Sequence, residues 1–348
     1  MRSLKLNGTI VNDENEAYVI AEIGNNHQGD VEICKQMFDA AKECGANAVK
    51  LQKRDNRSMF TKAAFNQVYN SENAFGRTYG EHREFLEFGE REYAVLKEYA
   101  SEIGIDFFAT AFDLNSADFL ASFDMPFYKI ASGDLTNTPL LKHVAKIGKP
   151  VILSTGGGTM ADVRRAYEAI MPINDQLAIL QCTAAYPCQP EDMNLRVIET
   201  YMREFPDVVI GLSDHQNGIA MAMVAYTMGA RIFEKHFTLD RTWKGTDHAF
   251  SLTSKGLSNL VRDLHRARTS LGNGVKQPLD LEVSPIKKMG KKIVAARDLP
   301  AGTVLTFEDL AFKCPADGMP PYELDNVLGK TLTAELPEDG DLSFDILK

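Results

Sequence analysis

The sequence predicts an eight-stranded (β/α)8 TIM barrel, preceded by an N-terminal hairpin and followed by a small, mostly β domain. Short apolar runs alternate with longer segments of helical periodicity, and eight such pairs fit within about 270 residues. A run of Gly, Asn and Pro residues that follows residue 271 predicts the end of the barrel. We therefore expect a barrel domain at residues 1–275, a linker at 276–290 and a second domain at 291–348.

The first predicted element is a hairpin at residues 4–11, where apolar and polar residues alternate on both sides of Asn7-Gly8. Both of these residues tolerate the positive φ of a two-residue turn. We expect the hairpin to act as a plug or a lid. The apolar runs that we interpret as barrel strands are residues 18–23, 48–52, 106–111, 127–131, 151–154, 177–181, 208–213 and 231–238. Helical periodicity is clearest at residues 31–43, 91–103, 160–171, 219–228 and 254–271.

Two segments interrupt this regular pattern. Residues 54–90, after the second strand, are rich in Asn, Arg, Glu and aromatic residues, and so long a connection in a compact domain is more often functional than not. We expect a lid or a subunit contact there. After residue 291 only short β-like runs occur, punctuated by Pro and Gly. A domain of about sixty residues is marginally stable alone, so we expect it to pack on the barrel or on a partner subunit.

The composition is that of a soluble globular protein, with 44% apolar and 25% charged residues among 348. A net charge of −10 argues against nucleic acid or an anionic membrane as the main partner, although a local cationic pocket can still bind a small anion. The five cysteines form no CxxC pair and suit a reducing compartment. The N-terminus lacks an apolar signal core, and no run approaches the roughly eighteen apolar residues of a membrane span. We therefore expect a cytoplasmic protein.

Polar side chains gather at the carboxyl ends of the predicted strands. Alternate residues of a barrel strand face inward, so in each strand either the odd-numbered or the even-numbered residues line the interior. The inward set contains Glu22, Gly24, Lys50, Gln52, Lys129, Gln181, Thr183, Gly211, Ser213, His215, Glu234 and His236. Burial of such groups without partners costs roughly 1–3 kcal/mol for each one. A ligand site explains the set better than mutual pairing alone.

The chemistry of this set indicates an anion beside a metal. Lys50 and Lys129 supply positive charge, and the Ser and Gly residues at 132–133, 154–158 and 213 supply hydroxyl and backbone N–H donors at strand-to-helix turns, which suit phosphate or carboxylate. Although a lone histidine is more often a satisfied core residue, His215 and His236 together would form half of a divalent metal site.

Sequence chemistry by itself leaves two reaction types open. A Schiff-base aldolase could use Lys50 or Lys129, because a lysine in a crowded cationic barrel can have a lowered pKa. The histidine pair favours a divalent ion that acts as a Lewis acid on a substrate carbonyl. The sequence contains neither a Gly-x-Ser-x-Gly elbow nor a Walker phosphate loop.

Several motifs that follow one another along the chain point to a known family. They are residues 21–29 (AEIGNNHQG), 49–52 (VKLQ), 129–134 (KIASGD), 180–187 (LQCTAAYP), 211–218 (GLSDHQNG) and 234–236 (EKH). The chain resembles the sialic acid synthases, which make N-acetylneuraminate and related nonulosonic acids. Its tail resembles the antifreeze-like (SAF) domain of that family. Residues 79–83, 190–198 and 242–248 resemble the animal-type branch, which acts on a 6-phosphorylated N-acylmannosamine, whereas many bacterial members use the free sugar.

The resemblance implies a reaction between phosphoenolpyruvate (PEP) and an N-acylmannosamine-type sugar. C3 of PEP would attack the C1 aldehyde of the open-chain sugar, water would attack C2, and phosphate would leave by C–O cleavage. The family also implies a domain-swapped homodimer in which each tail domain caps the barrel of the other subunit.

The same resemblance implies roles for individual residues. His215 and His236 would hold a manganese or magnesium ion, and Glu22 would transfer a proton. The residues implied for PEP binding are Lys50, Gln52, Thr110, Lys129, Ser132, Ser154 and Ser213. Those implied for sugar binding are Asp134, Tyr186 and Asp247.

The chain also departs from the family pattern. Where many bacterial members have Glu and Asn, this chain has Asp134 and Ala184. The family's tail-domain arginine, which reaches the acceptor from a neighbouring subunit, is replaced by Cys314, and Lys313 is the candidate substitute. Four side chains in the long connection are candidates for binding the phosphate of an acceptor sugar, although the charges of such a loop more often simply face solvent. They are Lys62, Arg77, His82 and Arg83.

Two alternative functions stay open at this point. The first is a different PEP-dependent keto-sugar-acid synthase, of the Kdo8P or DAHP type, acting on a pentose or tetrose phosphate. The second is a non-catalytic sugar-binding homologue. The presence of Glu22, His215 and His236 argues against the second alternative.

Overall fold

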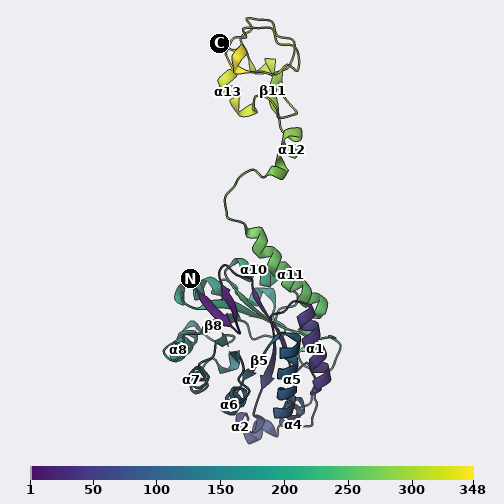
Figure 1. The fold of residues 1–348 in the computed structure, drawn as a ribbon, viewed down its shortest axis with the longest axis vertical. Coiled ribbons are helices and arrows are strands. Elements are labelled where there is room, and N and C mark those ends of the chain that lie inside the picture. The colour runs from purple at the N-terminus through teal and green to yellow at the C-terminus, as the bar shows by residue number, and fades with distance from the viewer. Residues whose placement is uncertain (1) are drawn as a thin grey trace. The chain divides into compact units, whose positions relative to one another are not determined.

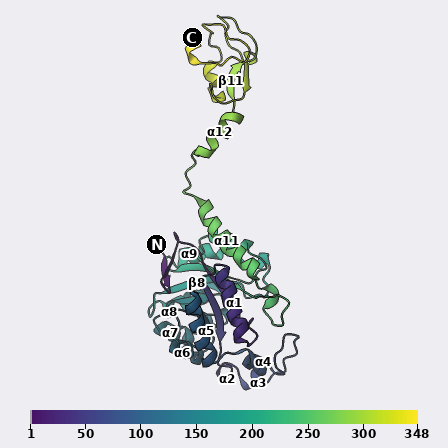
Figure 2. The ribbon, with the colours of Figure 1, turned by 45° about the vertical axis from the view of Figure 1, so that its right-hand side comes forward.

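The computed structural model describes residues 2–348, which divide into two compact units between Gly272 and Asn273. The first unit is a closed barrel of parallel strands in the order β10-β3-β4-β5-β6-β7-β8-β9 (Figures 1 and 2). These strands are β3 (Tyr18–Gly24), β4 (Ala48–Lys53), β5 (Asp106–Ala111), β6 (Tyr128–Ile130), β7 (Val151–Ser154), β8 (Leu177–Cys182), β9 (Val209–Asp214) and β10 (Ile232–His236). The predicted (β/α)8 barrel is confirmed.

Helices follow the strands and surround the barrel, and both views show α6, α7 and α8 side by side on its outside (Figures 1 and 2). The helices are α1 (Val31–Glu43), α5 (Glu90–Ile103), α6 (Leu114–Ser122), α7 (Thr138–Lys146), α8 (Met160–Ile170), α9 (Val197–Glu204), α10 (Ala220–Thr227) and α11 (Ser254–Leu271). Local sequence explains α1, because the Asp30 carboxylate caps its first turn and Met37, Phe38 and Ala41 bury one face. No helix within residues 2–348 is both long and apolar enough to cross a membrane.

The N-terminal hairpin closes the amino end of the barrel. Strands β1 (Ser3–Leu6) and β2 (Thr9–Asn12) pair in antiparallel fashion around Asn7 and Gly8, both of which have positive φ. Leu4, Leu6 and Val11 are buried in one cluster with residues at the starts of the barrel strands. The hairpin is therefore a plug at the end opposite the loops that follow the strands.

The long connection at residues 54–90 contains three helices: α2 (Asn56–Met59), α3 (Lys62–Phe65) and α4 (Tyr79–Leu86). A capping box between Thr78 and Glu81 starts α4. Gly80 lies against the ring of Phe65 so closely that a Cβ atom would approach ring carbons to 2.4 Å. This packing fixes α4 and the side chains that it carries.

The second unit has its own small core. Strands β11 (Lys292–Ala295) and β12 (Leu310–Lys313) pair in antiparallel fashion, and α13 (Leu324–Val327) follows them. The side chains of Ile293, Leu299 and Leu332, with several other apolar residues, form a buried cluster. The range predicted as a linker holds a helix, α12 (Asp280–Met289), which belongs to this unit and buries none of its residues.

Candidate active site

A cavity of about 500 Å³ lies at the carboxyl ends of the barrel strands. Most of the site residues expected from the sequence line it: Glu22, Lys50, Gln52, Thr110, Lys129, Ser132, Ser154, Tyr186, Ser213, His215, His236 and Asp247. Asp134 is not among the lining residues, and its Oδ1 accepts a hydrogen bond from Asn137 Nδ2 at 3.0 Å. The cavity thus brings together residues of seven strands or the loops after them, and Tyr186 from the loop after β8.

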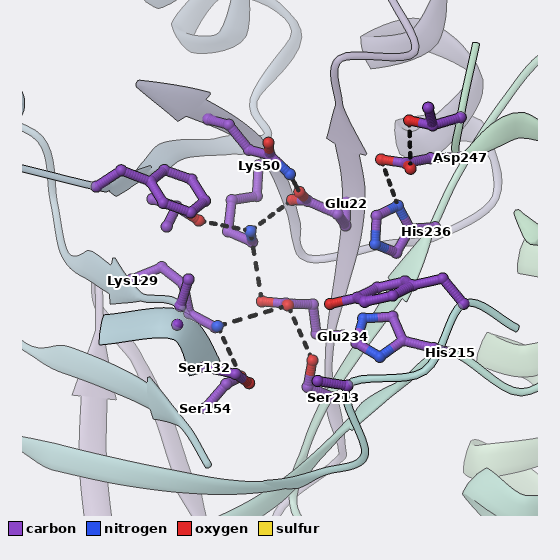
Figure 3. A pocket seen from close by; sticks show the side chains of 18 of the residues that line it. Glu22, Lys50, Lys129, Ser132, Ser154, Ser213, His215, Glu234, His236 and Asp247 are labelled. Carbon is purple, nitrogen blue, oxygen red and sulfur yellow. Dashed lines mark hydrogen bonds and ion pairs between the residues drawn. The ribbon is translucent and has the colours of Figure 1, made fainter. Parts of the chain in front are cut away.

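Four buried charged residues occupy the floor of this cavity, and we call them the ionic cluster: Glu22, Lys50, Lys129 and Glu234. Lys50 lies between the two carboxylates (Figure 3), with Nζ 2.6 Å from Glu22 Oε2 and 3.7 Å from Glu234 Oε2. Lys129 Nζ lies 3.6 Å from Glu234 Oε1. Two cations and two anions balance, so the cluster can stay buried without a ligand.

For Glu22, Glu234 and Lys129, burial and ion pairing shift the pKa in opposite directions. Burial raises the pKa of Glu22, and this effect exceeds the attraction of Lys50. Burial also raises the pKa of Glu234, but Lys129 and Lys50 outweigh it and bring that pKa to about 2. Burial lowers the pKa of the Lys129 ammonium. Glu22 is therefore the carboxylate of the pair that more readily accepts a proton.

A hydrogen bond from Gln52 and the absence of a side chain at Gly24 together fix the position of the Glu22 carboxylate. Gln52 Nε2 donates to Glu22 Oε1 at 2.7 Å. Gly24 has a φ of +56°, and a Cβ atom there would lie 3.0 Å from Glu22 Oε1 and 3.1 Å from Gln52 Nε2. A side chain at position 24 would push this pair apart, which explains the glycine.

Hydroxyl groups surround the two lysines. Lys129 Nζ donates to Ser154 Oγ at 2.7 Å, and Lys50 Nζ donates to Thr110 Oγ1 at 2.8 Å. Ser213 Oγ donates to Glu234 Oε1 at 3.2 Å. These donors and the two ammonium groups form a cradle for a small polyanion, provided that the anion replaces the carboxylates as partner of the lysines.

His215 and His236 lie next to each other at the edge of the ionic cluster, with ring centroids 5.3 Å apart (Figure 3). His215 Nδ1 donates to the carbonyl oxygen of Thr183 at 3.1 Å, which leaves Nε2 as the nitrogen with a lone pair. Burial and the neighbouring His236 lower the pKa of His215 to about 4, and burial lowers that of His236. Both imidazoles are therefore neutral at neutral pH.

The pair fits a divalent metal ion. His236 Nδ1 is buried and has no hydrogen-bond partner in the described part of the chain, and Asp247 Oδ2 lies 3.7 Å from it. Neutral imidazole nitrogens are common ligands of transition metals. Within residues 2–348 no group of three His, Cys, Asp or Glu side chains has metal-binding geometry. Two protein ligands would leave coordination positions open for substrate and water.

Sequence reasoning missed some lining residues. Glu234 was in the inward set but had no expected role, although it contacts both lysines. Arg54 lines the cavity and has the same parity along the chain as Lys50 and Gln52, so parity could have identified it. Of the four side chains considered in the long connection, Arg83 lines the cavity, whereas Lys62 and Arg77 are exposed. The fourth, His82, is buried, and its Nδ1 accepts the backbone N–H of Phe75 at 3.1 Å.

Family comparisons cover both units of the chain. Residues 37–276 match the sequence profile described as the NeuB family, and residues 292–344 match the SAF domain. The chain is 43% identical to N-acetylneuraminate-9-phosphate synthase from Mus musculus over 95% of this chain and 93% of that protein. It is 38% identical to N,N'-diacetyllegionaminic acid synthase from Legionella pneumophila, over 92% of this chain and 91% of that protein.

Solved structures agree with these matches. The crystal structure of N-acetylneuraminic acid (sialic acid) synthetase from Leptospira borgpetersenii, in complex with citrate, superposes with a TM-score of 0.71 at 32% identity. The match covers 82% of this chain and 95% of that one. A truncated 3-deoxy-D-arabino-heptulosonate 7-phosphate synthase from Thermotoga maritima superposes with a TM-score of 0.60 over 79% of this chain and 94% of that one. Its 15% identity shows the barrel fold alone.

Proposed function

This chain belongs to the NeuB family, and from that membership we propose that it condenses PEP with the aldehyde of an N-acylmannosamine-type sugar. The products are a sialic or other nonulosonic acid and inorganic phosphate. One observation of the site supports the proposal most strongly: two lysines, ringed by hydroxyl donors, lie beside a buried glutamate and a pair of neutral histidines. That arrangement suits a polyanionic substrate next to a carbonyl that must be activated.

PEP would bind over the ionic cluster. Its phosphate and carboxylate would take Lys50 and Lys129 as partners, together with the hydroxyl groups of Ser132, Ser154 and Ser213. Gln52 and Thr110 lie within the same cavity. Because binding would draw Lys50 away from Glu22, the buried Glu22 carboxylate would lose its main stabilising charge and become a stronger base.

The acceptor sugar would enter above PEP. Tyr186 and Asp247 line that part of the cavity beside the two histidines, with the Tyr186 ring centroid 4.3 Å from that of His215. A new bond would form between C3 of PEP and C1 of the sugar, and the aldehyde oxygen would become a hydroxyl group. Water would add to C2, and the C2–O bond to phosphate would then break, which leaves a ketone. Glu22 would move the protons of these steps.

We also propose that His215 and His236 bind a manganese or magnesium ion. Such an ion, when bound, supplies Lewis acidity to the aldehyde oxygen. The neutral state of both imidazoles and the unpartnered, buried Nδ1 of His236 support this part of the proposal. In this proposal, His215 and His236 would orient the acceptor, and the two lysines of the ionic cluster would hold PEP.

The assembly and location that we propose are a domain-swapped homodimer in the cytoplasm. The SAF match of the second unit supports the assembly. Lys313, considered as a substitute for the missing arginine, forms an ion pair with Asp339 within its own unit. The five free cysteines of the chain suit a reducing compartment.

Phosphate release during incubation with PEP and a divalent metal tests the reaction. Three acceptors would be compared: N-acetylmannosamine, its 6-phosphate and a 2,4-diacetamido hexose. We expect at least one to support release of phosphate in equal amount to a new nonulosonic acid, and Glu22→Gln to abolish it. Release with a pentose or tetrose phosphate only would favour the alternative keto-sugar synthase. Absence of release with every acceptor would contradict catalysis.

A further inference from the structure

Two arginines line the cavity without facing a carboxylate, and the first is Arg54. Arg54 is the first residue after β4 and is only 7% exposed. Its guanidinium carbon lies over the ring of Phe112, 3.9 Å from the ring centroid. Nη2 donates to Gln52 Oε1 at 2.6 Å, whereas Nη1 is buried and has no hydrogen-bond partner within residues 2–348. An unpaired buried donor on a charged group is costly, so this position is suited to an acceptor atom supplied by a ligand.

Arg83 is the second of these arginines, and α4 carries it to the cavity wall. Its Nε and Nη2 both donate to the Tyr79 hydroxyl, at 3.0 and 2.9 Å. The carboxylate of Glu87 is already engaged, since it pairs with Lys53 Nζ at 2.8 Å and accepts the backbone N–H of Arg54 at 3.1 Å. Among residues 2–348, no carboxylate forms an ion pair with the Arg83 guanidinium.

The two guanidinium groups repel each other. Burial, together with the positive charge of Arg83, lowers the pKa of Arg54 to about 10. The Arg54 guanidinium still carries its charge at neutral pH. Across the described part of the chain, residues 2–348, neither one takes part in an ion pair. An anion between them would relieve the repulsion.

We propose that Arg54 and Arg83 bind a phosphate monoester at the end of the acceptor sugar remote from its aldehyde. This inference rests on the proposed function and adds to it that the phosphorylated form of the sugar is the acceptor. A phosphate monoester carries close to two negative charges and three acceptor oxygens, which suit two planar guanidinium groups better than a single carboxylate does. The free Nη1 of Arg54 and the unpaired charge of Arg83 are the contacts available to it.

The position of Arg54 separates this subsite from the PEP cradle. Lys50, Gln52 and Arg54 alternate inward along β4 and its extension, with about 3.3 Å of rise per residue. Arg54 therefore lies roughly 13 Å along the chain from Lys50, toward the mouth of the cavity. Gln52 bridges the two regions, since it accepts from Arg54 and donates to Glu22. A bound phosphate would hold Arg54 in place and so steady the amide that directs the Glu22 carboxylate.

The test compares kcat/KM for N-acetylmannosamine 6-phosphate and for free N-acetylmannosamine at saturating PEP. We expect the full-length protein to prefer the phosphorylated sugar. Arg83→Gln and Arg54→Gln each remove a charge-assisted hydrogen bond, so the preference should fall by about 10- to 100-fold in either variant. In Arg83→Gln the KM for PEP should stay within about 3-fold of its original value, because the Arg83 guanidinium donates to the Tyr79 hydroxyl and to none of the residues proposed to hold PEP.

Arg77→Gln is the matched control, because Arg77 is an exposed cation in the same segment that does not line the cavity. It should leave the preference unchanged. A protein that prefers the free sugar, or an Arg83→Gln variant that raises the KM for PEP and leaves the preference intact, would overturn this inference while the proposed function stands. Failure to consume PEP with any acceptor would overturn both. Circular dichroism of each variant identifies loss of fold, and Arg83→Lys supplies a second variant that keeps the charge.

Discussion

At the residue scale, the ionic cluster shows how buried cations are balanced by carboxylates at the site that we propose for PEP. Lys50 and Lys129 are buried and would repel each other, but Glu234 lies 3.7 and 3.6 Å from their ammonium groups. Its negative charge opposes the effect of burial, which lowers the pKa of the Lys129 ammonium. An anionic substrate that displaces this internal partner meets two charged, correctly placed groups.

Glu234→Gln should test this balance. Removal of one charge leaves two ammonium groups with only the Glu22 carboxylate, so we expect the ligand-free protein to lose about 3–5 kcal/mol of unfolding free energy. PEP should restore more stability to the variant than it adds to the original protein, because it supplies the missing negative charge. Thermal unfolding with and without PEP measures both effects. Equal stabilisation of the two proteins by PEP would contradict the role given to Glu234.

His236→Ala should separate the metal proposal from the fold. The imidazole lies beside His215 and makes no hydrogen bond through its buried Nδ1, so its removal should cost little stability. We expect turnover to fall by at least about 100-fold and manganese binding, measured by calorimetry, to be lost. His143→Ala is the control, since that histidine pairs with Asp118 away from the cavity. Full, metal-independent turnover of the His236 variant would contradict the assignment.

At the scale of single elements, β4 shows how one strand serves two functions. Lys50 and Gln52 face the cavity, whereas Lys53 faces outward, where its Nζ contacts Glu87 at 2.8 Å and lies 4.6 Å from the ring centroid of Phe119. The alternation of a strand places these neighbours in different environments. Lys53 therefore helps to hold residues 54–90 against the barrel while Lys50 takes part in the site.

The hairpin β1–β2 is predicted to contribute stability and no chemistry. Leu6 is fully buried in the plug, so Leu6→Ala should lower the unfolding free energy by about 2–5 kcal/mol through lost burial and the cavity left behind. The plug is at the opposite end of the barrel from the site, so kcat should stay the same at a temperature where the variant is folded. Urea unfolding and a turnover assay measure the two quantities. Ile10→Ala is the control, since Ile10 is 50% exposed, and a large loss of kcat in the Leu6 variant would contradict this separation.

At the scale of the whole molecule, the chain has two units with separate cores. The second unit spans Asn273–Lys348, and its α12 buries none of its residues, while Leu281 and Val283 on it are 77% and 62% exposed. Apolar side chains exposed along one helix are typical of a surface that another chain covers. In the proposed dimer, the partner subunit would supply such a cover.

Light scattering should therefore find the full-length protein as a dimer at micromolar concentration. A chain that ends at Gly272 should keep the folded barrel, because that unit contains its own core. We expect it to bind PEP through the ionic cluster and to turn over the acceptor at least about 10-fold more slowly, because the tail domain of the partner would no longer cap the barrel. A fully active monomer would contradict the domain-swapped assembly.

The sequence by itself determined the barrel, the hairpin and those lysine, glutamate and histidine side chains of the cavity lining that strand parity selects. These follow from local rules: strand parity assigns inward faces, and residues at the carboxyl ends of parallel strands must converge. Only the tertiary structure decided which polar groups pair across the barrel. The contact of Glu234 with two lysines joins three strands, and the approach of Arg83 depends on how α4 packs through Gly80 against Phe65. Such distances between remote segments depend on the packing of the whole unit, which no local pattern encodes.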